Sequence, residues 1–220
     1  MKKLYSIRIQ NGFESILPVT ILESAKFDCI NFKSVIENWK TVTFKFVDVD
    51  DKSNKKPDIS FPVGLPSGLV FPAPLKNLLF PNSNVGLEFL PISISGENWF
   101  LVNCLNSTDK YNSIESKFHR DPSLSSVNVS EADEEALLQK LLSVMKSNST
   151  DVSFLSVGTG QIFHIEKLVL EENAILNTQE LFTITDSNRA LLIALPSFVE
   201  RVNKLKLRGI SFSEIGILAG

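Results

Sequence analysis

Residues 208–215 read RGISFSEI, and residues 85–92, located 123 positions earlier, read VGLEFLPI. Both stretches contain glycine, an apolar residue, a polar residue and phenylalanine in the same order. Glycine is favoured where the backbone needs a positive φ, and alternating apolar residues are typical of a strand with one buried face. Each stretch therefore predicts a strand that begins directly after a glycine.

The similarity extends to both sides of these stretches without gaps. At a shift of 123 residues, apolar residues match in the pairs Leu69/Leu192, Val70/Ile193, Leu75/Phe198, Leu79/Val202, Leu87/Ile210, Phe89/Phe212 and Ile92/Ile215, and Gly86 matches Gly209. The pattern predicts a repeated unit of a short strand, a helix started by proline, a glycine that ends the helix and a second strand. Any connection from a helix through glycine to a strand gives a similar pattern, so a chance resemblance between the two units stays open.

Other segments predict further strands and short helices. Residues 41–47 place Val42, Phe44 and Phe46 on one face, and residues 98–105, 161–170 and 181–185 also have strand character. Prolines limit residues 61–81 to at most one short helix, near residues 73–80, and a second short helix follows residues 189–195. Residues 107–129 are polar and predict a loop, whereas residues 130–146 predict a longer amphipathic helix with an acidic first turn.

These elements predict an α+β fold with a mainly antiparallel sheet, a few short helices and one longer amphipathic helix. We expect one domain over residues 1–220, built from two related strand, helix, strand halves at about residues 40–110 and 155–220. The chain has 43% apolar residues and 16 phenylalanines, which is enough for a core without metals or disulfides.

Composition excludes several classes of protein. The net charge is −3 and the 22 basic residues are spread along the chain, so no basic stripe for nucleic acid is present. The longest strongly apolar run, residues 190–195, is far shorter than the ~20 residues that span a bilayer. The start has no signal-peptide pattern, so we expect a cytoplasmic protein. Cys29 and Cys104 have no neighbouring cysteine or histidine at metal-ligand spacing, and we expect two reduced, packed thiols, no metal and no cofactor.

Several segments resemble a known family. KPDIS at residues 56–60, PLKNLL at 74–79, VGLEFLPISISGENWFLVNCLNSTD at 85–109, IFHIEKLVL at 162–170, ELFTI at 180–184 and FVERVNKLKLRGISFSEI at 198–215 follow one another in the order of a bacterial immunity-protein family. The chain resembles immunity family eleven of the polymorphic toxin systems over residues 48–215. The resemblance implies a cytoplasmic protein that is not an enzyme and that binds and blocks a cognate toxin.

The resemblance also motivates a hypothesis about the toxin-binding surface. Asp48, Asp50 and Asp51 lie in a polar stretch that predicts a solvated loop, and complementary charge would speed their encounter with a basic toxin. Tyr111 and Trp39 are aromatic residues that could anchor a partner in a pocket.

A different class of function is an alternative. His119 and His164 are the two histidines of the chain, and a small hydrolase or ligand-binding domain could have a site near either one. His119 falls in the predicted loop, and His164 falls on the more polar side of a predicted strand with Glu166 two residues later. A catalytic base needs a positioned partner, and no nucleophile motif accompanies either histidine. We therefore expect structural or solvated histidines and no catalytic residue.

Overall fold

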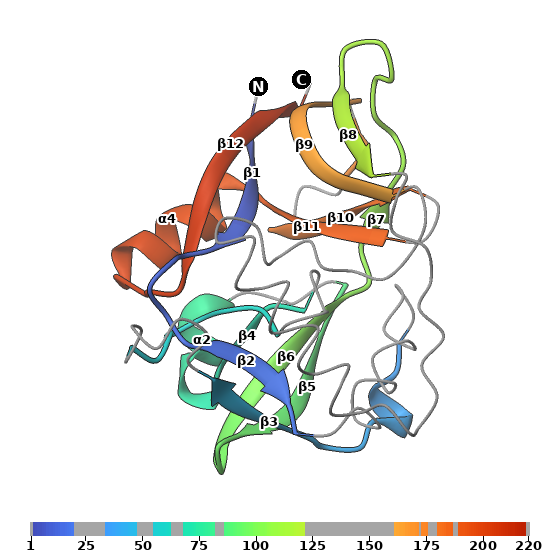
Figure 1. The fold of residues 1–220 in the computed structure, drawn as a ribbon. Helices are drawn as coiled ribbons and strands as arrows, with labels where there is room; N and C mark the ends of the chain where they lie inside the picture. Colours follow the sequence, from blue (N-terminus) through green and yellow to red (C-terminus); the bar gives the residue numbers. More distant parts are fainter. Residues whose placement is uncertain are drawn as a thin grey trace.

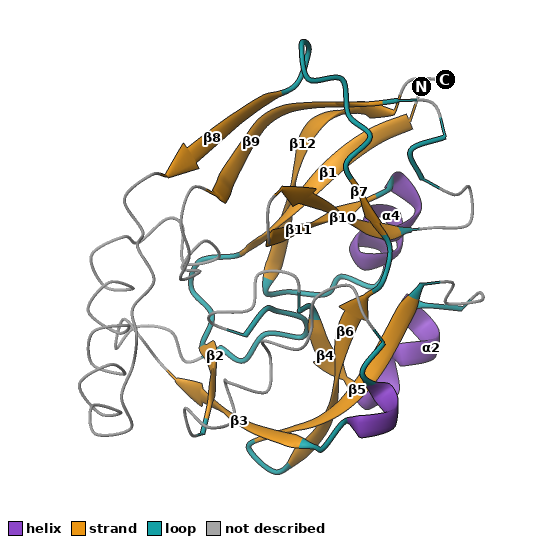
Figure 2. Cartoon of the chain, turned by 90° about the vertical axis from the view of Figure 1, so that its right-hand side faces the viewer, coloured by secondary structure: helices purple, strands orange, loops and turns teal. Residues whose placement is uncertain are grey.

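In a computed structural model the chain forms two curled sheets, one above the other, with two short α-helices along one side (Figure 1). The structure describes residues 2–19, 34–47, 55–62, 68–81, 86–121, 161–171, 173–175, 180–186 and 189–218. Figure 2 shows both helices on the same side of the molecule, next to the region where the two sheets meet. Within the described residues the fold is broadly α+β and consists mostly of strands.

The large sheet has seven described strands in the order β7, β10, β11, β1, β12, β9, β8. Their bounds are β1 (Lys2–Ile9), β7 (Ser107–Thr108), β8 (Lys117–Asp121), β9 (Gln161–Leu170), β10 (Leu181–Asp186), β11 (Arg189–Ala194) and β12 (Ile210–Leu218). The helix α4 (Pro196–Lys204) connects β11 to β12, and its first residue is a proline, whose fixed φ suits the first helical turn.

The small sheet has five described strands in the order β2, β3, β5, β6, β4. Their bounds are β2 (Ser15–Pro18), β3 (Val42–Val47), β4 (Val70–Pro72), β5 (Leu87–Ile94) and β6 (Glu97–Cys104). A 3-10 turn, η2 (Ile36–Asn38), precedes β3, while η3 (Ala73–Leu75) and α2 (Lys76–Leu79) together form the short helix between β4 and β5.

The predicted mainly antiparallel sheet is only partly right, because both sheets are mixed. Of the described strand pairs, seven run antiparallel and three, β3/β5, β9/β12 and β7/β10, run parallel. Parallel neighbours need a crossover connection rather than a hairpin. The crossover from β3 to β5 contains α2, and the crossover from β9 to β12 contains α4.

Isolated bridges link the outer parts of each sheet and explain why both are curled. In the small sheet, Ser60 bridges to Val70 of β4 and Pro62 bridges to Ile16 of β2, so one short segment joins the two outer strands. In the large sheet, β7 pairs with β10, and Tyr111, three residues after β7, bridges to Leu170 of β9.

Each sheet encloses its own apolar core. The small-sheet core consists of Ile16, Val42, Phe44, Val70, Leu90, Ile92, Ile94, Trp99 and Leu101. The large-sheet core consists of Leu4, Ile165, Leu168, Leu170, Phe182, Ile184, Ile193, Leu195 and Ile215. Because strand residues alternate between faces, the opposite faces of both sheets contribute to a third cluster.

This third cluster, the central core, joins the two sheets through the helices. Its buried members are Ile7, Ile59, Phe61, Leu69, Phe71, Leu79, Phe80, Phe89, Val102, Cys104, Leu181, Leu192, Ala194, Phe198, Val199, Val202 and Ile210. Phe80, directly after α2, stacks on Phe198 of α4 with ring centroids 5.6 Å apart. Arg201 of α4 donates to the carbonyl oxygen of Leu79 at 2.6 Å and forms a bidentate pair with Glu180, with both N–O distances at 2.6 Å. The helices are therefore held to each other by packing and by hydrogen bonds.

The small sheet and five consecutive strands of the large sheet have the same arrangement. In the small sheet the neighbouring strands follow the order β4, β6, β5, β3, β2, and in the large sheet the corresponding row of neighbours is β11, β1, β12, β9, β8. Along both rows, successive neighbours run antiparallel, antiparallel, parallel and antiparallel. The first strand of the chain, β1, thus occupies in the large sheet the position that β6 occupies in the small sheet.

The pairing registers also correspond. Phe89 lies opposite Val102 in the small sheet, and Phe212 lies opposite Ile7 in the large sheet. Phe212 comes 123 positions after Phe89, and Ile7 comes 95 positions before Val102. The same two shifts relate the pair Val70 and Leu101 to the pair Ile193 and Ser6. The correspondence ends at a bulge, where Tyr5 faces Glu214 but Leu4 faces Gly216.

The glycine that the sequence pattern placed at the helix end has a different role. Lys206, two residues after the end of α4, has a φ of 54°, and the amides of Lys206 and Leu207 donate to the carbonyl oxygens of Asn203 and Val202. These two bonds are those of a Schellman motif. Gly209 lies further on, has a φ of 111° and would place an added Cβ 2.3 Å from the carbonyl oxygen of Ile59. Glycine is therefore required there by backbone conformation and by close approach of another segment.

Two other expectations had different outcomes. The polar residues 107–129, predicted as a loop, contain the strands β7 and β8 because their backbones pair with β10 and β9. The predicted amphipathic helix at residues 130–146 lies outside the described residues. In the described parts of the chain, no helix is both long enough and apolar enough to cross a membrane.

Candidate functional site

The acidic residues Asp48, Asp50 and Asp51 lie outside the described residues, but both ends of their segment are described. On one side, Val47 pairs with Ser15 at the start of β2. On the other side, the amide of Glu14 donates to the carbonyl oxygen of Lys55 at 3.0 Å. The two ends are therefore attached to adjacent residues of the chain, Glu14 and Ser15.

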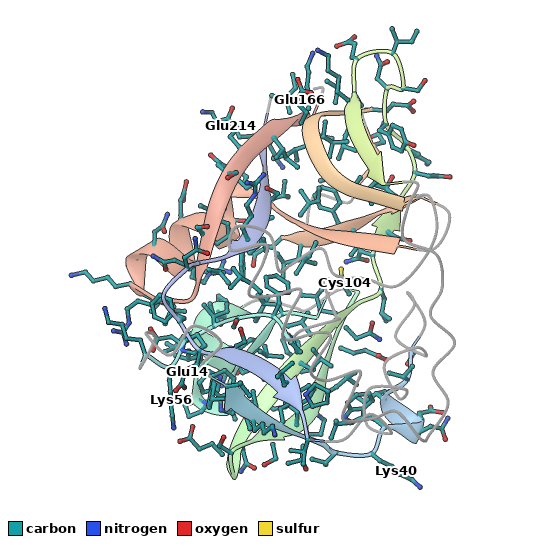
Figure 3. The ribbon with its side chains drawn as sticks, in the orientation of Figure 1. Glu14, Lys40, Lys56, Cys104, Glu166 and Glu214 are labelled. Carbon is teal, nitrogen blue, oxygen red and sulfur yellow. The ribbon has the colours of Figure 1, made fainter. Side chains whose placement is uncertain are left out.

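The surroundings of these two ends carry mixed charge. Lys45, Lys55 and Lys56 are exposed, and the ammonium group of Lys56 lies 5.2 Å from the centre of the Phe46 ring. Figure 3 shows Glu14 and Lys56 on the same side of the small sheet. A basic partner that approaches the aspartates would therefore also meet lysines, which weakens a purely electrostatic account of binding.

Tyr111 belongs to the large sheet and so comes from a different sheet than the two ends of the acidic segment. It bridges to Leu170, is half-buried and packs against the large-sheet core. The next residue, Asn112, donates its amide to the carbonyl oxygen of Val169 at 2.9 Å. Tyr111 is therefore held in place by the sheet, with part of its side chain still accessible.

A buried carboxylate that sequence reasoning did not single out positions another candidate surface. Glu88, the second residue of β5, accepts hydrogen bonds from the amide of Val35 at 3.1 Å, from Nδ2 of Asn103 at 2.8 Å and from the hydroxyl of Ser34. Burial by itself would raise the pKa of Glu88, but these hydrogen bonds together hold it below its usual value. A glutamate between the apolar residues Leu87 and Phe89 is the signal that could have indicated such a network.

This network fixes the segment that precedes β3. Directly after the contacts at Ser34 and Val35, Ile36 is 50% exposed, and Trp39 donates from Nε1 to the carbonyl oxygen of Pro91 at 2.9 Å. An exposed isoleucine and a half-buried tryptophan are thus carried on a turn that is anchored to β5 from both sides. Ile36 and Trp39 together form a rigid apolar projection, and a rigid projection can bind a partner without a large cost in conformational entropy.

Cys104 is a structural thiol. It is buried in the central core between the two sheets (Figure 3), and its sulfur lies 3.5 Å from the carbonyl oxygen of Asn106 and 3.7 Å from that of Leu181. Burial raises its pKa to about 12, so the reactive thiolate is not populated near neutral pH. Cys104 is buried and packed, as predicted, while Cys29 lies outside the described residues.

The two histidines lie on paired strands. His119 is in β8 rather than in a loop, so that prediction was wrong, and the register places it opposite His164 of β9. The described side chains contain no group of three or more histidine, cysteine, aspartate or glutamate residues able to hold a metal, and the side chains of His119 and His164 are not among those described.

The segments that resemble immunity family eleven contribute strands to both sheets and include residues of both α-helices. They include all of β5, β6, β7 and α2 and most of β9, β10, α4 and β12. The chain matches no protein-family model, and a comparison with curated proteins finds no significant match. The resemblance therefore rests on the residues quoted for it.

Proposed function

We propose that this chain is an immunity protein that binds and neutralises a cognate bacterial toxin domain with one-to-one stoichiometry in the cytoplasm of the producing cell. The observation that carries the proposal is the ordered set of segments resembling immunity family eleven, above all WFLVNCLNSTD at residues 99–109 and GISFSEI at residues 209–215. These two segments belong to β6, β7 and β12 and to the connections beside them.

Inhibition by occlusion requires a preformed surface rather than a reactive group. The polar side chains of Glu88, Asn103, Glu180 and Arg201 are engaged in hydrogen bonds within the protein. Their role is to hold the backbone, and a rigid surface binds with little loss of conformational freedom. We propose that the chain covers the active site or the substrate path of the toxin and performs no chemistry itself.

Three regions are proposed to contribute to the toxin-binding surface. The acidic residues Asp48, Asp50 and Asp51 would guide encounter, and Tyr111 and the projection formed by Ile36 and Trp39 would supply apolar anchors. The support for the projection is its anchoring by Glu88 and the 50% exposure of Ile36.

We also propose that the two sheets are related halves of one domain over residues 1–220. One support is the order and direction of five strands, which the two sheets share together with the pairing registers. A second support is that the residues paired by the 123-residue shift lie in equivalent places: either both in or packed against the central core, or one in the small-sheet core and the other in the large-sheet core. In this arrangement the second half includes β1, so its five strands are not contiguous in sequence. This differs from the expected limits at about residues 40–110 and 155–220, which left β1, β2 and β8 outside both halves.

The decisive experiment is growth rescue. The toxin domain encoded beside this gene is expressed in a sensitive host with and without this chain, and the two proteins are then copurified. Rescue with one-to-one copurification supports the proposal. A toxic neighbour that is neither bound nor neutralised removes the proposal for that pair, and a hydrolase or ligand-binding function near His119 or His164 then becomes the first alternative to test.

Charge-matched variants test the contribution of the acidic residues. The triple variant Asp48→Asn, Asp50→Asn, Asp51→Asn should slow association with the toxin by about tenfold at low salt and have less effect at high salt. The control variant carries Glu97→Gln, Glu171→Gln and Glu200→Gln, which remove three exposed negative charges elsewhere on the protein. Equal association rates for the two variants would show that these aspartates do not guide the encounter.

A further inference from the structure

Two basic segments that are far apart in the sequence meet beside the connection from α4 to β12. Residues 55–58 read KKPD and residues 204–208 read KLKLR. The amides of Asp58 and Ile59 donate to the carbonyl oxygen of Arg208 at 2.8 Å and 3.1 Å, and the amide of Arg208 donates to Oδ2 of Asp58 at 2.9 Å. The fold thus joins two segments whose contacting residues are 150 positions apart.

The basic side chains of both segments are exposed. They form a surface that we call the basic patch, which consists of Lys55, Lys56, Lys204, Lys206 and Arg208. Leu205 and Leu207 alternate with the cations of the second segment and pack against the central core, which leaves the cations on the outer side. Figure 3 shows Lys56 on the same side of the molecule as α4.

Contacts within the protein use little of this positive charge. Asp58 forms an ion pair with Nε of Arg208 at 3.1 Å, and the ammonium group of Lys56 lies over the ring of Phe46. In the parts of the chain that the structure describes, the remaining three lysines of the patch form no ion pair. These three ammonium groups are therefore available to a partner.

Two further acidic residues lie beside the basic patch. Glu14 donates its amide to the carbonyl oxygen of Lys55, and Glu200 lies one helical turn before Lys204. With Asp58, they place three acidic groups beside five basic ones, in a chain whose net charge is −3. The patch therefore has the opposite sign of charge to the chain as a whole.

Local structure explains only part of this clustering. The helix dipole favours a cation near the C-terminal end of a helix, which accounts for Lys204 in the last turn of α4. It does not account for Lys206, which lies beyond the helix, or for Lys55, which belongs to the other segment. An ion pair as exposed as that of Arg208 and Asp58 contributes little to stability. The folded state therefore does not need these charges to be gathered at one place.

We propose that the basic patch is a docking surface for an acidic segment of a partner polypeptide. Carboxylates of such a segment would come within the ~10 Å over which exposed charges attract each other at moderate salt. Complementary charge also speeds encounter and fixes the orientation of the two surfaces. The inference does not depend on the proposed immunity function.

The surroundings of the patch favour a polypeptide over a nucleic acid or a membrane. Single-stranded nucleic acids stack their bases on exposed aromatic rings, whereas the ring beside this patch, Phe46, is half-buried and lies under Lys56. Membrane binding uses apolar side chains that enter the lipid, whereas Leu205 and Leu207 pack against the central core. The negative net charge of the chain repels a long polyanion, while a short acidic segment responds mainly to the charges next to it.

The test measures binding of a fluorescently labelled oligoglutamate peptide to the full chain by anisotropy. The triple variant Lys55→Gln, Lys204→Gln, Lys206→Gln should weaken binding at low salt by about tenfold, because each exposed charge pair contributes a small part of the affinity. The matched control Lys2→Gln, Lys110→Gln, Lys167→Gln removes the same charge from exposed positions elsewhere and should change the affinity by less than about twofold. High salt should weaken binding to the unchanged chain.

A second readout needs no variant. In an NMR titration of the unchanged chain with oligoglutamate, amide shifts should concentrate at residues 55–59 and 204–209. Absence of binding, an equal loss in both triple variants, or shifts that concentrate elsewhere would each overturn the proposal. Tighter binding to a single-stranded oligonucleotide of equal length, or to phosphatidylserine vesicles, would also overturn it in favour of those partners. Because the probe contains no toxin, these outcomes are independent of growth rescue.

Discussion

The substitution Phe198→Ala tests whether the two sheets unfold as one cooperative unit. Phe198 is fully buried on α4, its ring stacks on Phe80 at 5.6 Å, and it meets Phe212 edge to face at 6.2 Å. Removing a buried phenylalanine side chain costs about 3–5 kcal/mol from lost burial and the cavity that remains. We expect a loss near 4 kcal/mol, because aromatic contacts with both neighbours are removed as well.

The assay uses the positions of the two tryptophans. Trp99 lies in β6, and Trp39 is hydrogen-bonded to Pro91 of β5, so tryptophan fluorescence reports on the small sheet. Urea unfolding has a slope of about 2–3 kcal/mol per molar for a chain of moderate size, so the fluorescence midpoint should fall by about 1–2 M. Far-UV circular dichroism, which reports on both sheets, should give the same midpoint.

The matched control is Ile114→Ala. Ile114 is 93% exposed, so this change should alter the free energy of unfolding by no more than about 0.5 kcal/mol. The reasoning fails if Phe198→Ala leaves the fluorescence midpoint unchanged while circular dichroism shows a second, earlier transition. That result would mean that the large sheet unfolds by itself and that the central core does not couple the sheets.

Three further changes test individual contacts. Glu88→Gln should lower the free energy of unfolding by about 1.5–3 kcal/mol at pH 7. Because the folded-state pKa of Glu88 is below its ordinary value of 4.5, this difference from the unchanged protein should shrink as the pH falls below 4.5. A constant difference from pH 7 to pH 3 in urea unfolding would contradict this. Glu180→Ala should cost about 1.5–3 kcal/mol by removing both bonds to Arg201, and a double-mutant cycle with Arg201→Ala should show coupling rather than additivity. Gly209→Ala should cost at least about 1–3 kcal/mol, because the residue has a positive φ and its Cβ would meet the carbonyl oxygen of Ile59; thermal unfolding at an unchanged midpoint would show that the backbone relaxes there.

Prediction from the sequence succeeded where a local pattern and the final packing agree. The alternation of Val42, Phe44 and Phe46 predicted β3, and both Val42 and Phe44 lie in the small-sheet core. The helical spacing of Phe198 and Val202 predicted α4, and both residues are buried. In these segments the apolar side chains that form the pattern are the same ones that the core removes from water.

Prediction failed where long-range pairing decides the structure of a polar segment. β8 has no strong apolar alternation, and it is a strand because its backbone groups pair with β9. The same limit applies to the candidate sites. No local signal shows that His119 lies opposite His164, or that Ser34 and Asn103 both donate to Glu88.

The sequence by itself determined the alternation of buried and exposed residues in most strands, the proline at the start of α4 and the repeated strand, helix, strand pattern, because these depend on the chemistry of residues close together in the chain. Only the tertiary structure decided that β1 lies between β11 and β12, that three strand pairs are parallel and that Lys206 rather than Gly209 forms the turn after α4. The reason is that these features depend on which distant backbones meet, and the free energy that selects them comes from burying the three cores together.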